Sequence, residues 1–255
     1  MSEEKYTKEK VLWSKKYTDK LMTFTITRPE SYQFKPGQFS RIGLPEDSGF
    51  IWRAYSIASS VNENFLEYYV VLIENGSMSQ RLSSIKDGDE ILLDKTAFGF
   101  LLPERFESGK NLVMLATGSG IAPFLSQLKF LALWEQFDKV ILVHSVSYQD
   151  ELVSLALVNK LHDYPELSSV LTQLQFVPVV TRNEVDGAFK ERVPALIVSG
   201  QLEERIGFKF TPEDTRFLIC GNPKMVQDTF KSLLDRGFSM HRNHLPGQII
   251  MENGF

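Results

Sequence analysis

An apolar run over residues 112–116 continues directly into the turn sequence Thr117-Gly118-Ser119-Gly120, and this junction restricts the fold more than any other feature. Short, continuous apolar runs are typical of strands buried in a parallel sheet, and a glycine turn commonly joins such a strand to the helix that follows. A second junction of this kind is Cys220-Gly221-Asn222-Pro223, at the end of the apolar run 217–220. The two junctions predict an α/β unit built on a parallel sheet.

Strand-like and helix-like segments alternate through the second half of the chain. Further apolar runs lie at 140–146 and 174–180. The expected helical stretches are 123–134, 150–162, 193–199 and 223–236. Pro123 and Pro223 suit the first turn of a helix, where a missing amide hydrogen costs nothing. We therefore predict an α/β, Rossmann-like domain with helices on both faces of its parallel sheet.

The first part of the chain has a different, alternating pattern. Over residues 21–27, the apolar side chains Met22, Phe24 and Ile26 alternate with mostly polar neighbours, which predicts a half-buried strand. Other expected strands are 39–44, 53–58, 66–73 and 90–94, separated by turn sequences that contain glycine. Several short strands at this spacing predict an antiparallel β-barrel.

Two further segments divide the chain. A short helix is expected within the barrel region at 79–85, with one of the serines at its start as the N-cap. A charged stretch at 103–110, which contains proline and glycine, indicates a linker. Because 255 residues exceed the usual single-domain size of roughly 100–200, we expect a barrel domain over 1–105 and an α/β domain over 106–255.

Composition limits the chemistry that the chain can carry out. The single cysteine, Cys220, excludes an intrachain disulfide and argues against a cysteine-ligated iron–sulfur cluster, which usually takes four thiolates. The four histidines show no spacing typical of a zinc site, so we expect no metal and an organic redox centre. A net charge of -4 argues against bulk nucleic-acid binding. No apolar run approaches the roughly 20 residues that span a bilayer, and the charged start does not resemble a secretory signal, so we expect a cytoplasmic protein without a membrane segment.

Two motifs suit nucleotides. The segment Arg53-Ala54-Tyr55-Ser56 combines a cation, an aromatic ring and a hydroxyl, which suits a phosphate-bearing flavin, although an ordinary barrel strand could contain the same residue types. Gly118 and Gly120 let backbone amides approach a pyrophosphate at the start of the following helix. A plain tight turn is the alternative, since Pro123 replaces the third glycine of the dinucleotide fingerprint. Ligands of parallel sheets bind beyond the carboxyl ends of the strands, so both glycine turns could face one nicotinamide.

In their order and spacing, these motifs resemble those of the ferredoxin-NADP reductase family, and the similarity covers nearly the whole chain. Segments that carry the resemblance include Leu115-Ala116-Thr117-Gly118, Val193-Pro194-Ala195-Leu196 and Cys220-Gly221-Asn222-Pro223-Lys224-Met225-Val226. They read most like the bacterial flavodoxin/ferredoxin-NADP reductases. The resemblance implies a monomeric, FAD-dependent oxidoreductase. Such a flavoprotein passes hydride between NADPH and FAD and exchanges single electrons with ferredoxin or flavodoxin.

The resemblance also assigns roles on the flavin side. It implies that Arg53 pairs with the FAD pyrophosphate, that Tyr55 stacks on the isoalloxazine and that Ser56 forms a hydrogen bond near flavin N5. A guanidinium fork suits phosphate oxygens, and a hydroxyl can donate or accept as N5 changes its protonation. Backbone groups around Val70 and the turn that follows would hold the ribityl and phosphate groups. The other residues assigned to FAD in this part of the chain are Ala54, Gly76, Ser77, Met78 and Ser79.

On the nicotinamide side, the resemblance implies that Thr117 and Cys220 flank the reacting ring and shape the hydride path. For Cys220 the alternative is a small buried side chain that ends a strand. Arg182 and Arg192 match the arginines that bind the 2′-phosphate, with ordinary surface charges as the alternative. Ser147 stands where related proteins have a further arginine. The other residues assigned to NADP(H) are Gly118, Thr181, Gly221, Asn222, Pro223, Lys224 and Asp228.

The end of the chain also resembles the family. Phe255 matches the terminal aromatic residue that lies against FAD, whereas Gly254 stands where another ring is common. Glu252 would contribute to the proton balance near the flavin. A frayed terminus is the alternative for this segment. The expected catalytic residues are Ser56, Cys220 and Glu252.

The choice of nucleotide separates the expected function from its alternatives. Asp150 and Glu151 suit the first turn of a helix, where carboxylates complement the dipole, so we do not interpret them as ribose ligands for NAD. NADPH is therefore the expected donor. One alternative is an NADH-dependent reductase that serves an oxygenase or a ferric complex. Another is a nucleotide-binding electron-transfer subunit without independent turnover.

Overall fold

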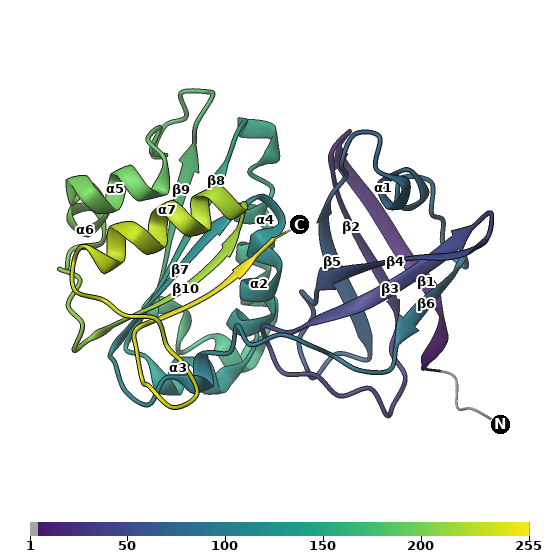
Figure 1. Ribbon diagram of the computed structural model, residues 1–255, viewed down its shortest axis with the longest axis horizontal. Helices are drawn as coiled ribbons and strands as arrows, with labels where there is room; N and C mark the ends of the chain where they lie inside the picture. The colour runs from purple at the N-terminus through teal and green to yellow at the C-terminus, as the bar shows by residue number, and fades with distance from the viewer. Residues whose placement is uncertain (1–4, 255) are drawn as a thin grey trace. The chain divides into compact units, whose positions relative to one another are not determined.

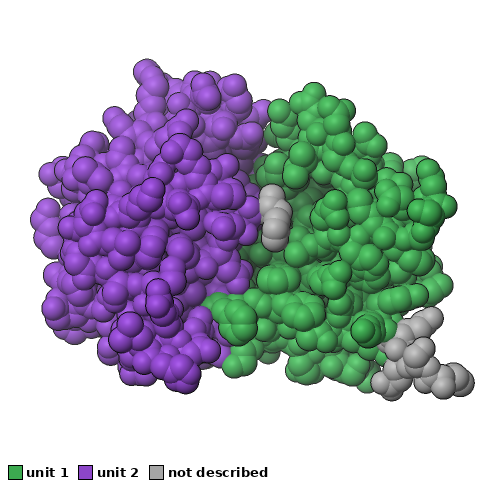
Figure 2. Space-filling model, in the orientation of Figure 1, with its two compact units in different colours: residues 1–100, 122–127 green, residues 101–121, 128–255 purple. Residues whose placement is uncertain are grey.

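The computed structural model describes residues 5–254, which form two compact units (Figure 2). Unit 1 runs up to Phe100 and includes Ala122–Gln127. Unit 2 consists of Leu101–Ile121 and the chain from Leu128 onward. Each unit has its own hydrophobic core.

Unit 1 is built on an antiparallel sheet (Figure 1). Its strands, as far as the structure describes them, are β1 (Tyr6–Thr18), β2 (Leu21–Thr27), β3 (Phe39–Glu46), β4 (Gly49–Ser56), β5 (Phe65–Val71) and β6 (Glu90–Asp94), in the order β4-β3-β6-β1-β2-β5. An antiparallel bridge between Ile57 and Tyr68 joins the end of β4 to β5, the strand at the opposite edge. The bridge curls the sheet on itself, and the predicted antiparallel barrel is confirmed.

The barrel core follows the alternation in the sequence only in part. On β2, Met22, Phe24 and Ile26 are at most 1% exposed. Leu21 and Thr23 on the other face are also buried, so the half-buried pattern expected for this strand begins only at residue 25. Strand β1 was not predicted, because of its 13 residues only Glu9 and Val11 are buried and the apolar signal is weak.

The helix of unit 1 begins earlier than predicted. Helix α1 (Ser77–Leu82) starts two residues before the expected range of 79–85. Its N-cap is Gly76, and no side chain caps the helix, so the expected serine cap is wrong. The Ser79 hydroxyl instead accepts a hydrogen bond from the Ile73 amide at 2.8 Å. This bond closes the loop between β5 and α1 on itself.

Unit 2 is built on a parallel sheet. The strands that the structure describes there are β7 (Asn111–Thr117), β8 (Lys139–Val146), β9 (Leu174–Val180), β10 (Thr215–Gly221) and β11 (Ile249–Asn253), in the order β11-β10-β7-β8-β9. The chain moves outward from β7 to β8 and β9, then crosses back to place β10 on the other side of β7. The strand order therefore reverses between β7 and β10, which is the topological switch point of the sheet. The predicted α/β domain is confirmed.

Short helices flank the parallel sheet (Figure 1). They are α3 (Leu131–Gln136), α4 (Ser154–Asn159), α5 (Val193–Ser199), α6 (Gln201–Ile206) and α7 (Pro223–Leu234). Helix α2 (Ala122–Leu128) follows β7 in the sequence, but all of it except Leu128 belongs to unit 1. The single helix expected over 123–134 is two helices, because Phe130 adopts an extended conformation between them. Only the middle of the stretch expected at 150–162 is α-helical, with 3₁₀ turns on either side. Within the described residues, no helix is long and apolar enough to cross a membrane.

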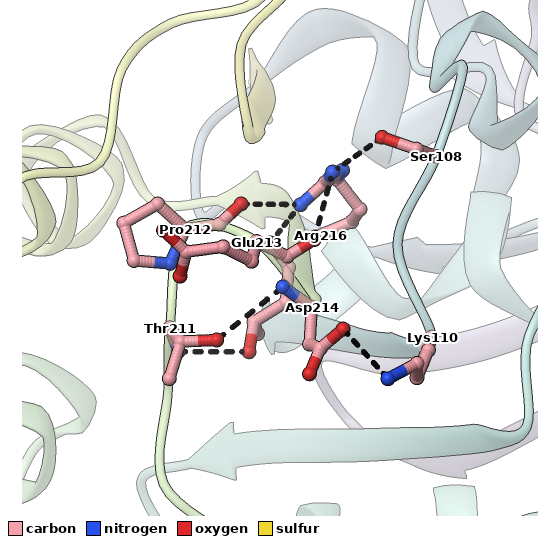
Figure 3. Close-up of polar contacts among 8 residues, drawn as sticks. Ser108, Lys110, Thr211, Pro212, Glu213, Asp214 and Arg216 are labelled. Carbon is pink, nitrogen blue, oxygen red and sulfur yellow. Dashed lines mark hydrogen bonds and ion pairs between the residues drawn. The ribbon is translucent and has the colours of Figure 1, made fainter.

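A cluster of polar contacts joins the segments that precede β7 and β10 (Figure 3). The buried guanidinium of Arg216 donates hydrogen bonds of 2.8–3.2 Å. Their acceptors are the carbonyls of Pro212, Glu213 and Thr215 and the hydroxyl of Ser108. Lys110 and Asp214 form an ion pair of 3.2 Å beside them. This Arg216 cluster fixes the amino ends of two central strands to each other.

Candidate functional site

The carboxyl edge of the parallel sheet gathers most of the residues that the sequence assigned to NADP(H). In a parallel sheet all strands end at the same edge, so the segments that follow them lie in one row. Thr117 and Gly221 end the two strands at the switch point, and Ser147 and Thr181 follow the next two strands. Gly118, Arg182, Asn222, Pro223 and Lys224 continue these segments, and Gly254 follows β11 at the same edge. The switch point of such a sheet is where dinucleotides bind in open α/β folds.

The two glycine turns pack backbone against backbone at the switch point. A Cβ at Gly221 would overlap the Thr117 side-chain oxygen, and a Cβ at Gly120 would overlap the Cys220 carbonyl oxygen. Gly221 also has φ 139° and Gly118 has φ 53°, conformations that L side chains rarely adopt. The Thr117 hydroxyl oxygen accepts a hydrogen bond from the Asn222 amide at 2.8 Å. The alternative considered for the first motif was a plain tight turn after β7. Such a turn alone does not explain why the turn after β10 also requires a glycine.

The last described residue joins the same edge. The Gly254 amide donates to the Gly221 carbonyl at 2.7 Å. A Cβ at Gly254 would lie 3.2 Å from Gly221 backbone atoms, closer than side chains ordinarily approach. This crowding explains why glycine suits position 254 in this chain, although the resemblance implies that another aromatic ring is common there. Phe255, the other terminal residue assigned to FAD, lies outside the described residues.

Cys220 and Glu252 are neighbours on adjacent strands. The two residues pair in the register of β10 and β11. The Cys220 thiol is 3% exposed, and its pKa is raised to about 12, first by burial and second by the Glu252 charge. The thiol is therefore neutral near pH 7, and a small neutral group at this place can shape the site without exchanging a proton.

Helix α7 begins directly at the site. The Asn222 side chain accepts hydrogen bonds from the amides of Lys224 and Met225, at 2.9 and 3.4 Å, and Pro223 occupies the first turn. The Lys224 ammonium pairs with Asp228 at 2.8 Å, and this hydrogen bond lowers the pKa of the Asp228 carboxyl. Two of the residues assigned to NADP(H) are thus paired with each other on an exposed helix face.

The region expected to hold a 2′-phosphate follows β8 and β9. The Arg182 amide donates to the Ser147 carbonyl at 2.8 Å, which places these two exposed residues side by side. Within the described residues the Arg182 guanidinium forms no ion pair. Arg192 is exposed at the start of α5, and its charge contributes to the lowered pKa of Asp228, so it lies on the α7 side of the unit.

An open depression of about 760 Å³ lies beside this region. It is lined by Tyr148, Gln149, Asp150 and Asn183. The Glu151 carboxylate accepts hydrogen bonds from the amides of Ser147 and Tyr148, at 2.8 and 3.0 Å. A carboxylate therefore stands next to Ser147, the position where the family resemblance implies an arginine.

The residues assigned to FAD lie on β4, on β5 and at the start of α1. Helix α1 and strand β5 both contact β4, so Val70 and the segment Gly76-Ser77-Met78-Ser79 belong to the same part of the barrel as residues 53–56. Arg53 is exposed, donates to the carbonyl of Trp52 at 2.8 Å and forms no ion pair within the described residues. Tyr55 is half-buried, and burial raises the pKa of its hydroxyl to about 12, against the lowering effect of Arg53. The Tyr55 hydroxyl is therefore neutral, and the Arg53 cation lies two positions earlier on the same strand.

His144 belongs to this site, but the sequence analysis did not assign it a role. His144 lies on β8 beside Ala116 of β7, and its imidazole contacts the carbonyl of Gly118 in the first glycine turn. The sequence signal was present, because a histidine stands within the otherwise apolar run 140–146. A buried polar side chain in such a run needs hydrogen-bond partners, and the turn after β7 and the first residue of α4 supply them.

Two family models match this chain and divide it as the fold does. Residues 9–96 match the oxidoreductase FAD-binding domain, and residues 114–231 match the oxidoreductase NAD-binding domain. The first range contains β2–β6 and all but the first three residues of β1, and the second contains both glycine turns. The chain therefore carries an FAD-binding and an NAD-binding domain.

Similar proteins match most of the length of this chain. The ferredoxin-NADP reductase of Azotobacter vinelandii is 35% identical over 251 residues, which are 97% of this chain and 96% of the relative. The flavodoxin/ferredoxin-NADP reductase of Escherichia coli K12 is 36% identical over 220 residues, 86% of each chain. A crystal structure of a ferredoxin NADP+ reductase from Neisseria gonorrhoeae with bound FAD and NADP matches with a TM-score of 0.93 and 53% identity, over 99% of this chain and 100% of that one. The chain therefore belongs to the ferredoxin-NADP reductase family of FAD-dependent oxidoreductases.

Proposed function

We propose that this protein transfers hydride between NADPH and FAD and exchanges single electrons with ferredoxin or flavodoxin. The observation that carries the proposal is the pair of glycine turns at the switch point, where Gly120 and Gly221 leave no room for a side chain. Close backbone approach without Cβ atoms is what a pyrophosphate site requires. The N. gonorrhoeae relative, with FAD and NADP bound, supports the assignment of both cofactors.

The barrel residues fit a flavin dinucleotide. Arg53 is a cation with no ionic partner in the described part of the chain, and a guanidinium suits the two phosphates of FAD. The neutral ring of Tyr55 would cover the isoalloxazine and exclude water from it, and the Ser56 hydroxyl would bond near N5. The backbone of Ala54, Val70, Gly76, Ser77, Met78 and Ser79 would hold the ribityl and phosphate groups. FAD would supply the conversion between two-electron and one-electron chemistry.

The carboxyl edge of unit 2 fits NADP(H). We assign the nicotinamide to the switch point, where Thr117 and neutral Cys220 would restrict the position of the ring and Glu252 would set the local charge. Exposed Arg182, Ser147 and Arg192 would bind the 2′-phosphate end. The other proposed ligands at this edge are Gly118, Thr181, Gly221, Asn222, Pro223, Lys224 and Asp228, whereas Gly254 is proposed on the FAD side from the resemblance. Among the proposed residues, Ser56, Cys220 and Glu252 would lie nearest the reacting atoms, and Phe255 is proposed from the resemblance alone.

Use of NADH is the second candidate, and one observation favours it. Ser147 brings no charge to the expected 2′-phosphate position, and the Glu151 carboxylate is bonded to its amide. A fixed negative charge there would weaken binding of a 2′-phosphate by repulsion. An NADH-dependent reductase for an oxygenase or a ferric complex would have this property, as would an electron-transfer subunit without turnover of its own.

Other parts of the assignment are proposals of the same kind. We place the boundary between the two functional domains after residue 105, within the charged linker 103–110. A monomeric state and a location in the cytoplasm are predictions from the sequence. Ferredoxin or flavodoxin as partner is supported by the printed names of the A. vinelandii and E. coli relatives.

Steady-state kinetics and a visible spectrum test the proposal. The purified protein is expected to be yellow, to release FAD on denaturation and to lose its visible flavin absorbance when mixed with NADPH without oxygen. Its kcat/KM for NADPH should exceed that for NADH, with ferredoxin or flavodoxin as acceptor. A colourless protein, or a yellow one that NADPH does not reduce, would contradict the function. A preference for NADH would instead support the second candidate.

A further inference from the structure

The buried side chain of His144 contacts the first glycine turn, Thr117-Gly118-Ser119-Gly120. His144 is 0% exposed and lies on β8 next to β7. Its Nε2 lies 2.9 Å from the Gly118 carbonyl oxygen, and its Nδ1 lies 2.7 Å from the hydroxyl of Ser154, the first residue of α4. Ser154 is also fully buried. One imidazole thus joins the turn after β7 to the helix that follows β8.

The two neighbours determine which nitrogen carries the proton. A carbonyl oxygen only accepts hydrogen bonds, so Nε2 is the donor toward Gly118. Nδ1 of the neutral ring is then an acceptor, and the Ser154 hydroxyl donates to it. Burial lowers the pKa of His144 to about 4, with the bond to Gly118 acting in the opposite direction, so the ring is neutral near pH 7.

The bond to Gly118 sets the direction of the next backbone amide. The Gly118 carbonyl and the Ser119 amide belong to one planar trans peptide, in which C=O and N–H point in opposite directions. Because the carbonyl points to buried His144, the Ser119 N–H points away from it, toward the partly exposed side of the turn. Gly118, with φ 53°, can rotate more freely than other residues, so an outside contact is needed to hold this peptide in one orientation.

We propose that His144 is a positioning residue for NADP(H) binding: it holds the peptide between Gly118 and Ser119 so that the Ser119 amide faces the dinucleotide, and Ser154 holds the imidazole in the required tautomer. The inference rests on the proposed function, because it needs the dinucleotide at the glycine turns. His144 is buried and acts only through the turn.

Two substitutions of His144 separate the contacts of its two nitrogens. His144→Gln can place an amide N–H near the position of Nε2 and keep the bond to Gly118. His144→Asn can place an oxygen near the position of Nδ1 and keep the bond from Ser154, but it does not reach Gly118. Val140→Ala, at a fully buried position of the same strand, is the control for a general loss of packing. The probe is NADP+, titrated by calorimetry into the FAD-loaded protein, with KM and kcat for NADPH measured in parallel.

The two His144 variants are expected to differ in their affinity for NADP+ and in their KM for NADPH. His144→Asn should raise the Kd for NADP+ and the KM for NADPH about tenfold, the order expected for loss of one buried hydrogen bond, with little change in kcat at saturation. His144→Gln should stay within about threefold of the unsubstituted protein. Val140→Ala should lower the melting temperature without raising the Kd. Equal effects of the Asn and Gln substitutions, or no effect of Asn, would overturn the proposal.

A second measurement does not depend on any variant. The ¹⁵N spectrum of the histidines should show His144 as the neutral Nε2–H tautomer from pH 8 down to about 5. An Nδ1–H tautomer would refute the inference even if the variants failed to fold. If the unsubstituted protein binds NADP+ and His144→Asn binds it equally well, only this inference fails. If the unsubstituted protein does not bind NADP+, the proposed function fails and the inference with it.

Discussion

Replacing Gly221 with alanine tests whether the two glycine turns depend on each other. The new methyl group would overlap the side-chain oxygen of Thr117 and would lie 2.7 and 2.8 Å from its backbone oxygen and nitrogen. Thr117 cannot move away easily, because its hydroxyl oxygen already accepts the bond from the Asn222 amide. The residue at 221 also has φ 139°, where alanine is strained.

The size of the effect follows from these two contributions. Backbone strain at such a φ costs about 1–3 kcal/mol. Insertion of a methyl group into filled space typically costs about 1–3 kcal/mol more. The free energy of unfolding should therefore fall by about 2–6 kcal/mol, which corresponds to a decrease of about 4–24 °C in the melting temperature of a domain of this size.

Thermal unfolding followed by circular dichroism measures this loss, and Gly237→Ala is the matched control. Gly237 also has a positive φ, of 86°, but a Cβ there would meet nothing within 4 Å. The control should show the strain alone, about 1–2 kcal/mol. If Gly221→Ala is no more destabilising than Gly237→Ala, the close packing of the two turns is not the reason for glycine at 221. The Gly221 variant should also bind NADP+ at least tenfold more weakly, which calorimetry measures if the variant folds.

Further predictions concern single charged side chains. Arg53→Ala should release FAD during gel filtration, and full retention would show that the pyrophosphate is held elsewhere. Arg182→Ala should lower the ratio of kcat/KM for NADPH over NADH about tenfold or more, the order of one charge-assisted contact, while FAD stays bound. Arg216→Ala should destabilise unit 2 by about 2–4 kcal/mol, because it leaves buried carbonyls without donors, but should not change the KM for NADPH. Burial raises the pKa of the Glu203 carboxyl, but the hydrogen bonds from Arg236 and from a backbone amide outweigh this, and the net shift is downward. The stabilisation by Glu203 is therefore present above the ordinary carboxyl pKa and is lost as the pH falls through the lowered one, so Glu203→Gln should flatten the acid side of a plot of melting temperature against pH.

The sequence predicted the fold best where an element coincides with a short, mostly apolar segment. Strands β6 and β9 and helix α5 have the bounds expected from their apolar patterns. Strand β1 could not be identified, since its hydrogen bonds to β2 and β6 hold it in place with few buried side chains. Helix α6 was not predicted either, because it begins after the left-handed Gly200 and has charged residues along its length. The break at Phe130 depends on tertiary packing that a local pattern does not contain.

The candidate site, too, could be predicted from the sequence only in part. The glycine turns at 118–120 and 221 were visible in the sequence as junctions of strands and helices. The contact between the two turns was not visible in the sequence. It requires that β10 pair with β7, although β8 and β9 lie between these two strands in the chain. The role of His144 was hidden for the same reason, since Ser154 and Gly118 are 10 and 26 residues away in sequence.

Strand β10 carries Arg216 near its start and Gly221 at its end. Five residues of extended chain separate them by about 16 Å, so the contacts that secure the amino ends of the sheet are remote from the loops at the opposite edge. Exchange of those loops by mutation, in nature or by design, would leave the Arg216 cluster intact. The scaffold can therefore acquire a different nucleotide preference without first losing its ability to fold.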